Sequence, residues 1–175
     1  MPIERSRRRI ASAQLAMLTG RLLNASSLCA IATISPGGRA HVNTAYFAWS
    51  PSLELVWFSE PHSRHSRNVR ANPSAAVAVY DSNQSWGRPD RGIQLFGRSR
   101  EQAGKHAQDA ERIYTKRFPD YAPHASTGYR FYRFRPTRVK LFDERALGGG
   151  TFVTARVGPD GALSWQRTEI YRAAP

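Results

Sequence analysis

The chain has 175 residues, of which 41% are hydrophobic and 22% charged, so it is long enough for one domain with a core and is not disordered in character. No apolar run approaches the roughly 18 residues of a membrane helix, and the one cysteine, Cys29, excludes an internal disulfide. The net charge is +13, but its basic residues are spread along the chain. We therefore expect a cytoplasmic protein with no membrane partner, and nucleic acid is not an expected partner.

The N-terminal quarter of the chain predicts an arm, a helix and a first strand. Residues 1–9 read as a loose basic arm. Apolar residues then recur at helical spacing from Ala11 to Leu22, which predicts an amphipathic helix. From Leu28 to Ile34 the apolar period changes to two, which predicts a strand.

Short strands separated by turn residues make up most of the remaining sequence. Strands are predicted, in chain order, at residues 40–49, 53–58, 75–80, 91–100, 128–143, 151–157 and 162–167. Helices are predicted at residues 63–71, with Ser63 as the N-cap, and at about residues 102–118. Residues 81–90 are predicted to form a loop.

This order of elements predicts a mainly β protein. Six or seven short strands with few helices are typical of a small antiparallel barrel. We expect a single domain over residues 10–175, with a C-terminal hairpin within residues 150–167. A barrel of this size can hold one flat ligand at its rim or between two copies of the chain.

The segment from Ser59 to Pro73 carries the strongest chemical signal. A strand ends at Phe58, and a turn rich in Ser, Arg and His opens a short helix. Backbone N–H groups at a helix start, together with Arg64, His65 and the hydroxyls of Ser59 and Ser63, would bind a phosphate. The alternative is a solvated, N-capped turn without a ligand.

Four pieces of the sequence, in the same order and spacing, resemble the pyridoxamine 5′-phosphate oxidase-like flavin-binding split barrels. The first two are the strand segment 41–47, which starts at a basic residue, and the aromatic strand end 56–58. The third is Ser59 followed by Ser63-Arg64-His65 and Asn72-Pro73, which is similar to the Thr-x-x-x-Ser-Arg-Lys…Asn-Pro pattern of that family. The fourth is a Trp loop followed by the strand 91–97. The resemblance covers about residues 26–142.

The resemblance implies FMN held at the interface of a homodimer. By position, Ser59, Ser63, Arg64 and His65 would hold the phosphate. The strand residues His41, Val42, Asn43 and Thr44, continuing to Tyr46, would lie along the flavin ring. Residues of the partner chain would close the site, namely Trp86, Arg91 and Gly92.

Two departures from the family pattern concern charge at this site. His65 stands where the family usually has Lys, so its charge would depend on pH. Tyr46 stands where the oxidases proper have a second Lys. The C-terminal region 145–150 also lacks the Arg-Leu-His-Asp-Arg stretch of the true oxidases. We therefore expect neither vitamin B6 as the substrate nor a true pyridoxamine-phosphate oxidase.

The functional hypothesis is an FMN-dependent oxidoreductase that acts on a small organic molecule. Its weak candidates for acid–base chemistry are His41 and Tyr46. One alternative is a deazaflavin-dependent reductase of the same fold, and the superfamily also includes haem binders. A second alternative is a non-catalytic barrel that binds a ligand or nucleic acid. No metal site is predicted, because no third ligand completes the pair His62 and His65.

Overall fold

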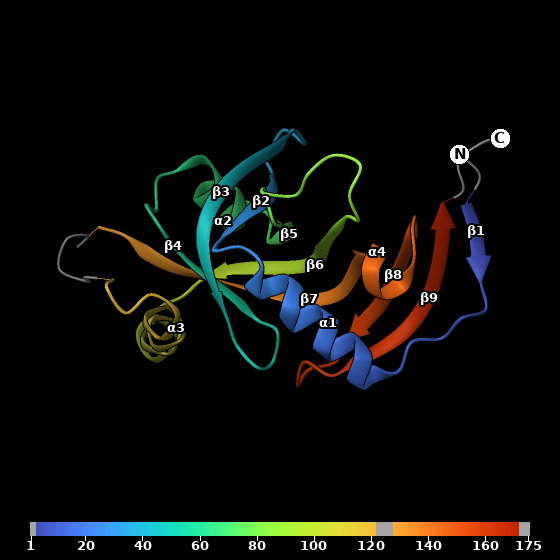
Figure 1. The fold of residues 1–175 in the computed structure, drawn as a ribbon. Helices are drawn as coiled ribbons and strands as arrows, with labels where there is room; N and C mark the ends of the chain where they lie inside the picture. Colours follow the sequence, from blue (N-terminus) through green and yellow to red (C-terminus); the bar gives the residue numbers. More distant parts are fainter. Residues whose placement is uncertain (1–2, 122–127, 172–175) are drawn as a thin grey trace. The chain divides into compact units, whose positions relative to one another are not determined.

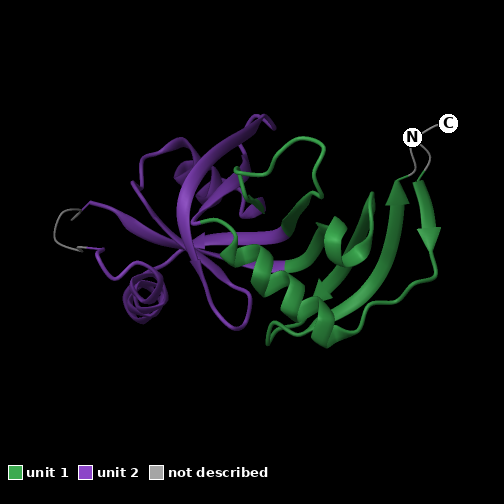
Figure 2. Ribbon diagram, in the orientation of Figure 1, with its two compact units in different colours: residues 1–26, 78–95, 137–175 green, residues 27–77, 96–136 purple. Residues whose placement is uncertain are grey.

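The computed structural model describes residues 3–121 and 128–171. The chain divides into two compact units, shown in Figure 2: unit 1 has residues 1–26, 78–95 and 137–175, and unit 2 has residues 27–77 and 96–136. Residues 1–2 of the expected arm and 172–175 of the expected domain lie outside the described residues. The assignment of residues 10–175 to a single domain stays a prediction. No described helix is both long and apolar enough to cross a membrane.

The described residues form nine strands and four helices (Figure 1). The strands are β1 (Ile3–Ser6), β2 (Leu28–Ile34), β3 (Ala40–Trp49), β4 (Leu55–Ser59), β5 (Ser74–Tyr80), β6 (Arg91–Glu101), β7 (Arg130–Asp143), β8 (Thr151–Val157) and β9 (Leu163–Tyr171). The helices are α1 (Ser12–Asn24), α2 (Arg64–Ala71), α3 (Gly104–Arg117) and α4 (Glu144–Leu147). The expected helices and strands are therefore present, with ends that differ by a few residues.

Six of the strands form a closed antiparallel barrel, which confirms the predicted fold class. Their order is β7-β4-β3-β2-β5-β6, and a pairing of β6 with β7 closes the ring. The remaining strands extend the sheet from β7 in the order β8-β9-β1. Strand β7 runs on past Pro136 and pairs first with β4 and then with β8, so it belongs to both units.

Glycine is required where β6 meets β7. A Cβ built on Gly97 would collide with the carbonyl oxygen of Arg135 and would lie 2.8 Å from the Cα of Pro136. The two backbones can approach this closely only because residue 97 has no side chain. The glycine that ends the 91–97 segment thus has a role in closing the barrel.

Strands β2 and β3 have one face that is buried in the barrel and one face that points outward. The buried residues of β2 are Cys29, Ile31 and Thr33, whereas Leu28 and Ile34 are exposed. The outward side, here called the outer face of β2–β3, pairs four residues of each strand: Leu28, Ala30, Ala32 and Ile34 with Tyr46, Thr44, Val42 and Ala40. The apolar alternation in the sequence therefore marks an uncovered face of the barrel rather than its core.

Helix α3 covers a neighbouring part of the same barrel. Ala110 and Tyr114 of α3 pack on Val56 of β4 and Phe131 of β7 in one hydrophobic cluster. A buried Arg133 on β7 forms ion pairs with Glu54 and with Asp109 of α3. The side chain of Asp109 is 42% exposed, so its ion pair with Arg133 is a modest addition to the hydrophobic packing that holds α3 in place.

In unit 1, the N-terminal arm is more ordered than the sequence suggests. Residues Ile3–Ser6 form β1, which pairs in antiparallel register with β9. The description of residues 1–9 as loose is therefore wrong for this stretch. Its backbone partner lies more than a hundred residues away, so no local pattern in the sequence could reveal the pairing. Helix α1 contacts β9 and buries Leu15, Leu18 and Leu22.

Candidate functional site

The end of β4 and the start of α2 form a compact polar cluster in unit 2. Ser63 is the N-cap of α2, and its hydroxyl accepts a hydrogen bond from the backbone N–H of Ser66. The Ser59 hydroxyl lies 2.8 Å from Nε2 of His65. The Ser63 hydroxyl lies 3.3 Å from the same imidazole. The sequence-predicted Ser59, Ser63 and His65 are thus brought together.

The imidazole of His65 is buried, with 9% of its surface exposed. Burial lowers the pKa of His65, the nearby His41 lowers it further, and Glu60 opposes this effect. The ring also lies edge-on to Tyr132, with the ring centroids 6.5 Å apart. At neutral pH the imidazole is therefore uncharged, and an anion placed beside it would favour its protonation.

Arg64 adds the one permanent positive charge among the predicted phosphate ligands. It occupies the first position of α2 and its side chain is exposed. The first N–H groups of a helix have no partner within the helix and carry partial positive charge. Two hydroxyls, a titratable imidazole and a guanidinium at a helix start fit a phosphate group.

A buried hydrogen bond fixes the position of α2. The side-chain amide of Asn68 donates to the hydroxyl of Thr33 on β2 at 3.0 Å, and both residues are buried. Asn68 therefore positions the helix that carries the predicted phosphate ligands, and it was not among the residues singled out from the sequence. Its place within a polar helix gave no sign that it faces the barrel.

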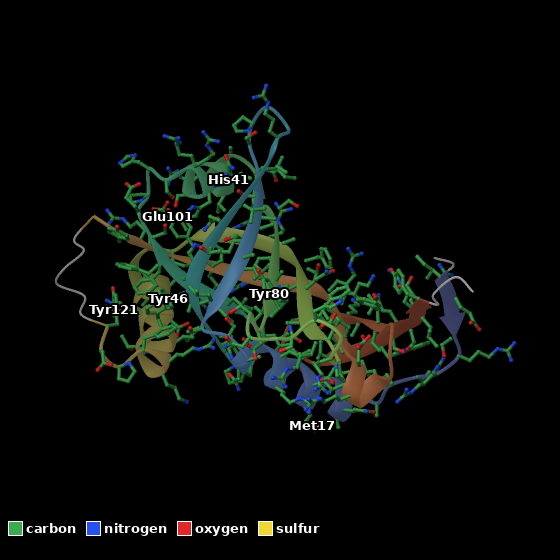
Figure 3. All side chains as sticks on the ribbon, turned by 45° about the horizontal axis from the view of Figure 1, so that its top comes forward. Met17, His41, Tyr46, Tyr80, Glu101 and Tyr121 are labelled. Atoms are coloured by element: carbon green, nitrogen blue, oxygen red, sulfur yellow. The ribbon has the colours of Figure 1, made fainter. Side chains whose placement is uncertain are left out.

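The predicted ring-side residues of β3 alternate between two faces of the strand. Val42, Thr44 and Tyr46 lie on the outer face of β2–β3, and Val42 and Tyr46 are 62% and 56% exposed. His41 and Asn43 are on the opposite face, where His41 acts on the charge of His65. Figure 3 labels His41 and Tyr46 at separate positions along β3. Because these residues lie on two faces of β3, a single flavin ring could contact all of them only by touching side chains of some and backbone atoms of others.

An unused acceptor lies in the middle of this strand. The side-chain oxygen of Asn43 is buried and has no hydrogen-bond partner among the described residues. Buried polar atoms are nearly always paired, so an unpaired acceptor here fits a site that a donor group of a ligand completes. Asn43 is one of the residues that the family resemblance assigns to the flavin.

Tyr46 marks the border between the outer face of β2–β3 and the part covered by α3. Its ring meets Phe118, which follows α3, in an edge-to-face contact with centroids 5.8 Å apart. Phe118 in turn packs on Tyr114 at 4.8 Å. This contact of α3 with the site is not visible in the sequence, because it depends on how the helix docks on the barrel.

The other predicted residues lie in unit 1. Trp86 is fully exposed in the loop between β5 and β6. Arg91 lies 3.5 Å from Asp81, and its backbone N–H donates to the side chain of Gln84. Gly92 is buried, and a Cβ there would lie 2.8 Å from the ring of Phe142. Packing inside unit 1 therefore already explains why residue 92 is glycine.

Other candidate chemistry is absent from the part of the chain that the structure describes. No group of three or more His, Cys, Asp or Glu residues in it could hold a metal ion. Cys29 is buried in β2, and burial raises the pKa of its thiol to about 12. A thiol that stays protonated is a poor nucleophile, so Cys29 is a core residue.

The sequence of this chain matches the model of a known protein family. A family model described as pyridoxamine 5′-phosphate oxidase matches residues 20–143. This range includes β2 to β7, α2 and every predicted site residue. No curated protein matches the sequence.

Solved structures share the fold at low sequence identity. A pyridoxamine 5′-phosphate oxidase-related, FMN-binding protein from Nostoc punctiforme is 14% identical with a TM-score of 0.60, covering 89% of this chain and 93% of that one. A heme-binding protein from Mycobacterium smegmatis is 17% identical with a TM-score of 0.66, covering 88% and 61%. A protein of unknown function from Agrobacterium tumefaciens is 21% identical with a TM-score of 0.59, covering 67% and 51%. This chain thus spans about half of the last protein.

Proposed function

Since the chain belongs to the pyridoxamine 5′-phosphate oxidase family, we propose that it is an FMN-dependent oxidoreductase acting on a small organic molecule. The observation that carries the proposal is the cluster of Ser59, Ser63 and His65 under the exposed Arg64 at the start of α2. These groups match the chemistry of a phosphate monoester, which is the anchor of FMN. A heme-binding protein has a similar fold, so haem is the second candidate cofactor.

Each site residue has a distinct part in this proposal. Arg64, Ser59, Ser63 and His65 hold the phosphate, and Asn43 supplies an acceptor beside the strand. FMN supplies the redox chemistry when bound. His41 lowers the pKa of His65 electrostatically, which favours a role at the phosphate end, whereas the ring of Tyr46 is exposed on the outer face. Tyr46 is therefore the better candidate for proton transfer to a substrate.

We propose that a second copy of this chain covers the outer face of β2–β3. That face is made of small or apolar residues, and Leu28, Val42 and Tyr46 are exposed on it. Exposed apolar patches of this kind mark interaction sites. The fully exposed Trp86, with Arg91, would reach the cofactor from the partner subunit, as in the family that the sequence resembles.

A charge placed on this face should separate the two copies. Ala32 lies opposite Val42 on the face and is not a predicted cofactor ligand. We expect the wild-type protein to sediment as a dimer and Ala32→Glu to sediment as a monomer that binds FMN at least tenfold more weakly. Analytical ultracentrifugation and FMN titration measure both effects. Ala16→Glu, the same substitution at an exposed position of α1, is the control and should leave both unchanged. A monomeric wild-type protein with full FMN affinity would contradict the dimer proposal.

The visible spectrum tests the choice of cofactor. The purified full-length protein is titrated separately with FMN, with a deazaflavin and with haem. We expect quenched flavin fluorescence and a shifted two-band spectrum with FMN at one equivalent per chain. A response to the deazaflavin alone would indicate a reductase of that branch, and a Soret band alone would indicate a haem protein. No response to any of them would favour a binding barrel without a redox cofactor.

The FMN affinity should depend on pH through His65. Burial holds its pKa below the usual value in the free protein, and a bound phosphate raises it, so binding takes up a proton. Affinity should therefore fall as the pH rises from the pKa of the free state to that of the bound state, by up to about tenfold per pH unit, and should level off at higher pH. Fluorescence titrations between about pH 6.5 and pH 8.5, above the second phosphate ionisation, measure this slope.

The matched variant is His65→Lys, which restores the residue type usual in the family. It should bind FMN with an affinity that is nearly constant over the same pH range, because an ammonium beside a phosphate stays charged. His41 and Glu60 are the other titratable groups that act on this imidazole. If His65→Lys kept the full pH slope, the dependence would come from another group.

A further inference from the structure

A second surface, in unit 1, gathers basic residues that are far apart in the sequence. It lies on β7, β8, β9 and β1, which are neighbours in this order in the sheet. Its basic residues come from all four strands: Arg5, Arg138, Lys140, Arg156 and Arg167. We call these five residues and the side of the sheet that carries them the cationic face.

The strand register places these residues on one side of the sheet. Arg138 lies directly opposite Arg156, and Lys140 lies opposite Thr154, which in turn pairs with Arg167. Arg5 pairs with Glu169 on the far strand of the sheet. Directly paired residues of antiparallel strands share a face, so all five basic side chains lie on the same side.

The other side of this sheet is covered. Val139 and Leu141, which alternate with the basic residues of β7, are fully buried, and so is Val153 of β8. Helix α1 contacts β9, and its Arg21 forms an ion pair with the buried Asp143 at the end of β7. The cationic face is therefore the side of the sheet away from this core. Arg5, Arg138 and Arg156 are exposed on it, whereas Thr154 is buried between Lys140 and Arg167.

The cationic face carries more basic than acidic side chains. Among the described residues of these strands, Glu169 lies on this side and forms ion pairs with both Arg167 and Lys140. Arg138 and Arg156 are exposed and directly opposite each other, so two guanidinium groups lie close together at this end of the face.

Three aromatic rings lie beside these charges. Phe142 and Phe152 are neighbours with centroids 5.2 Å apart, and Phe152 contacts Tyr171 at 4.8 Å. All three are partly exposed, and the ammonium of Lys140 lies 4.7 Å from the Phe152 ring. Proteins bind single-stranded nucleic acid with basic side chains that contact its phosphate backbone and with aromatic rings on which its bases stack.

From this arrangement we propose that the cationic face binds single-stranded nucleic acid without sequence preference. The proposal is independent of the cofactor site, which uses other residues. It departs from the expectation drawn from the sequence, in which the basic residues are spread along the chain. The register of four strands gathers five of them beside three aromatic rings.

The test uses the full-length protein and a fluorescein-labelled oligothymidine of about 20 nucleotides, followed by fluorescence anisotropy. The affinity should fall steeply between about 50 and 200 mM salt, with a log–log slope near −0.7 for each neutralised phosphate. The double variant Arg138→Gln, Arg156→Gln should make the slope shallower by about 1.4. Phe152→Leu should weaken binding about tenfold by removing one stacking surface.

The double variant Arg98→Gln, Arg100→Gln is the matched control. It removes the same charge from exposed positions of β6 that belong to unit 2, whereas the cationic face belongs to unit 1. We expect a much smaller loss of affinity and an almost unchanged slope. An equal loss in both double variants would overturn the proposal, because it would mean that only the net charge matters. So would binding to duplex DNA or to anionic vesicles as tight as that to the single strand.

Discussion

Replacing Arg64 by alanine should weaken FMN binding by about 10- to 100-fold. Arg64 opens α2 with an exposed guanidinium, next to the hydroxyl of Ser63 and the imidazole of His65. A hydrogen bond to a charged group contributes about 1.5–3 kcal/mol, and each 1.4 kcal/mol corresponds to a factor of ten in affinity. Fluorescence titration at neutral pH measures the dissociation constant, because His65 is then uncharged in the free protein and Arg64 supplies the permanent charge.

Arg67→Ala provides the control for this experiment. Arg67 is exposed on the same helix, three residues later, and its removal changes the net charge by the same amount. We expect its FMN affinity to stay within about threefold of the wild type, since charges exposed to solvent at this distance are largely screened. If Arg64→Ala and Ser63→Ala both bound FMN as tightly as the wild type, the assignment of the phosphate site would be wrong.

Replacing Gly97 by alanine should destabilise the whole barrel. The added methyl group would meet the carbonyl of Arg135 and the Cα of Pro136, which are backbone atoms that cannot rotate away. Overpacking of this kind costs about 1–3 kcal/mol and more when backbone must move. We expect a loss of about 3 kcal/mol, which lowers the melting temperature of a chain of this length by about 6–12 °C. Thermal denaturation followed by circular dichroism measures it.

Gly37→Ala is the matched substitution. Gly37 lies in the turn between β2 and β3, and a Cβ there would meet nothing within 4 Å. This change should alter stability by less than about 1 kcal/mol, because it only reduces the freedom of the unfolded chain. If the two variants melted at the same temperature, the close approach of β6 and β7 would not limit stability.

The sequence was sufficient for most of the secondary structure, except β1 and α4, and for one end of the proposed cofactor site. The alternating and helical periods located α1 and β2 to within a few residues. The N-cap at Ser63 was also visible, because capping depends on a few adjacent residues. Ser59 and His65 are six residues apart in the chain, so their contact in the proposed phosphate site is local as well.

The sequence pattern did not show which face of β2 is buried in the barrel. Leu28 and Ile31 are both apolar but lie on opposite faces of the strand, one exposed and one buried. Alternation reports that a strand has two faces, but when both carry apolar residues only the packing of the whole barrel decides which becomes the core. The same alternation divides the predicted ring-side residues of β3 between two faces.

Sequence alone thus determined the order of all elements but β1 and α4, the resemblance of residues 26–142 to a known family, and the residue types of the proposed phosphate turn. The tertiary structure decided which distant strands pair. It paired Arg5 of β1 with β9, which lies at the other end of the chain, and it set the register in which Arg138 of β7 is opposite Arg156 of β8. Local periodicity carries no information on such pairings, because their register depends on backbone hydrogen bonds between strands that any sequence of suitable pattern can form.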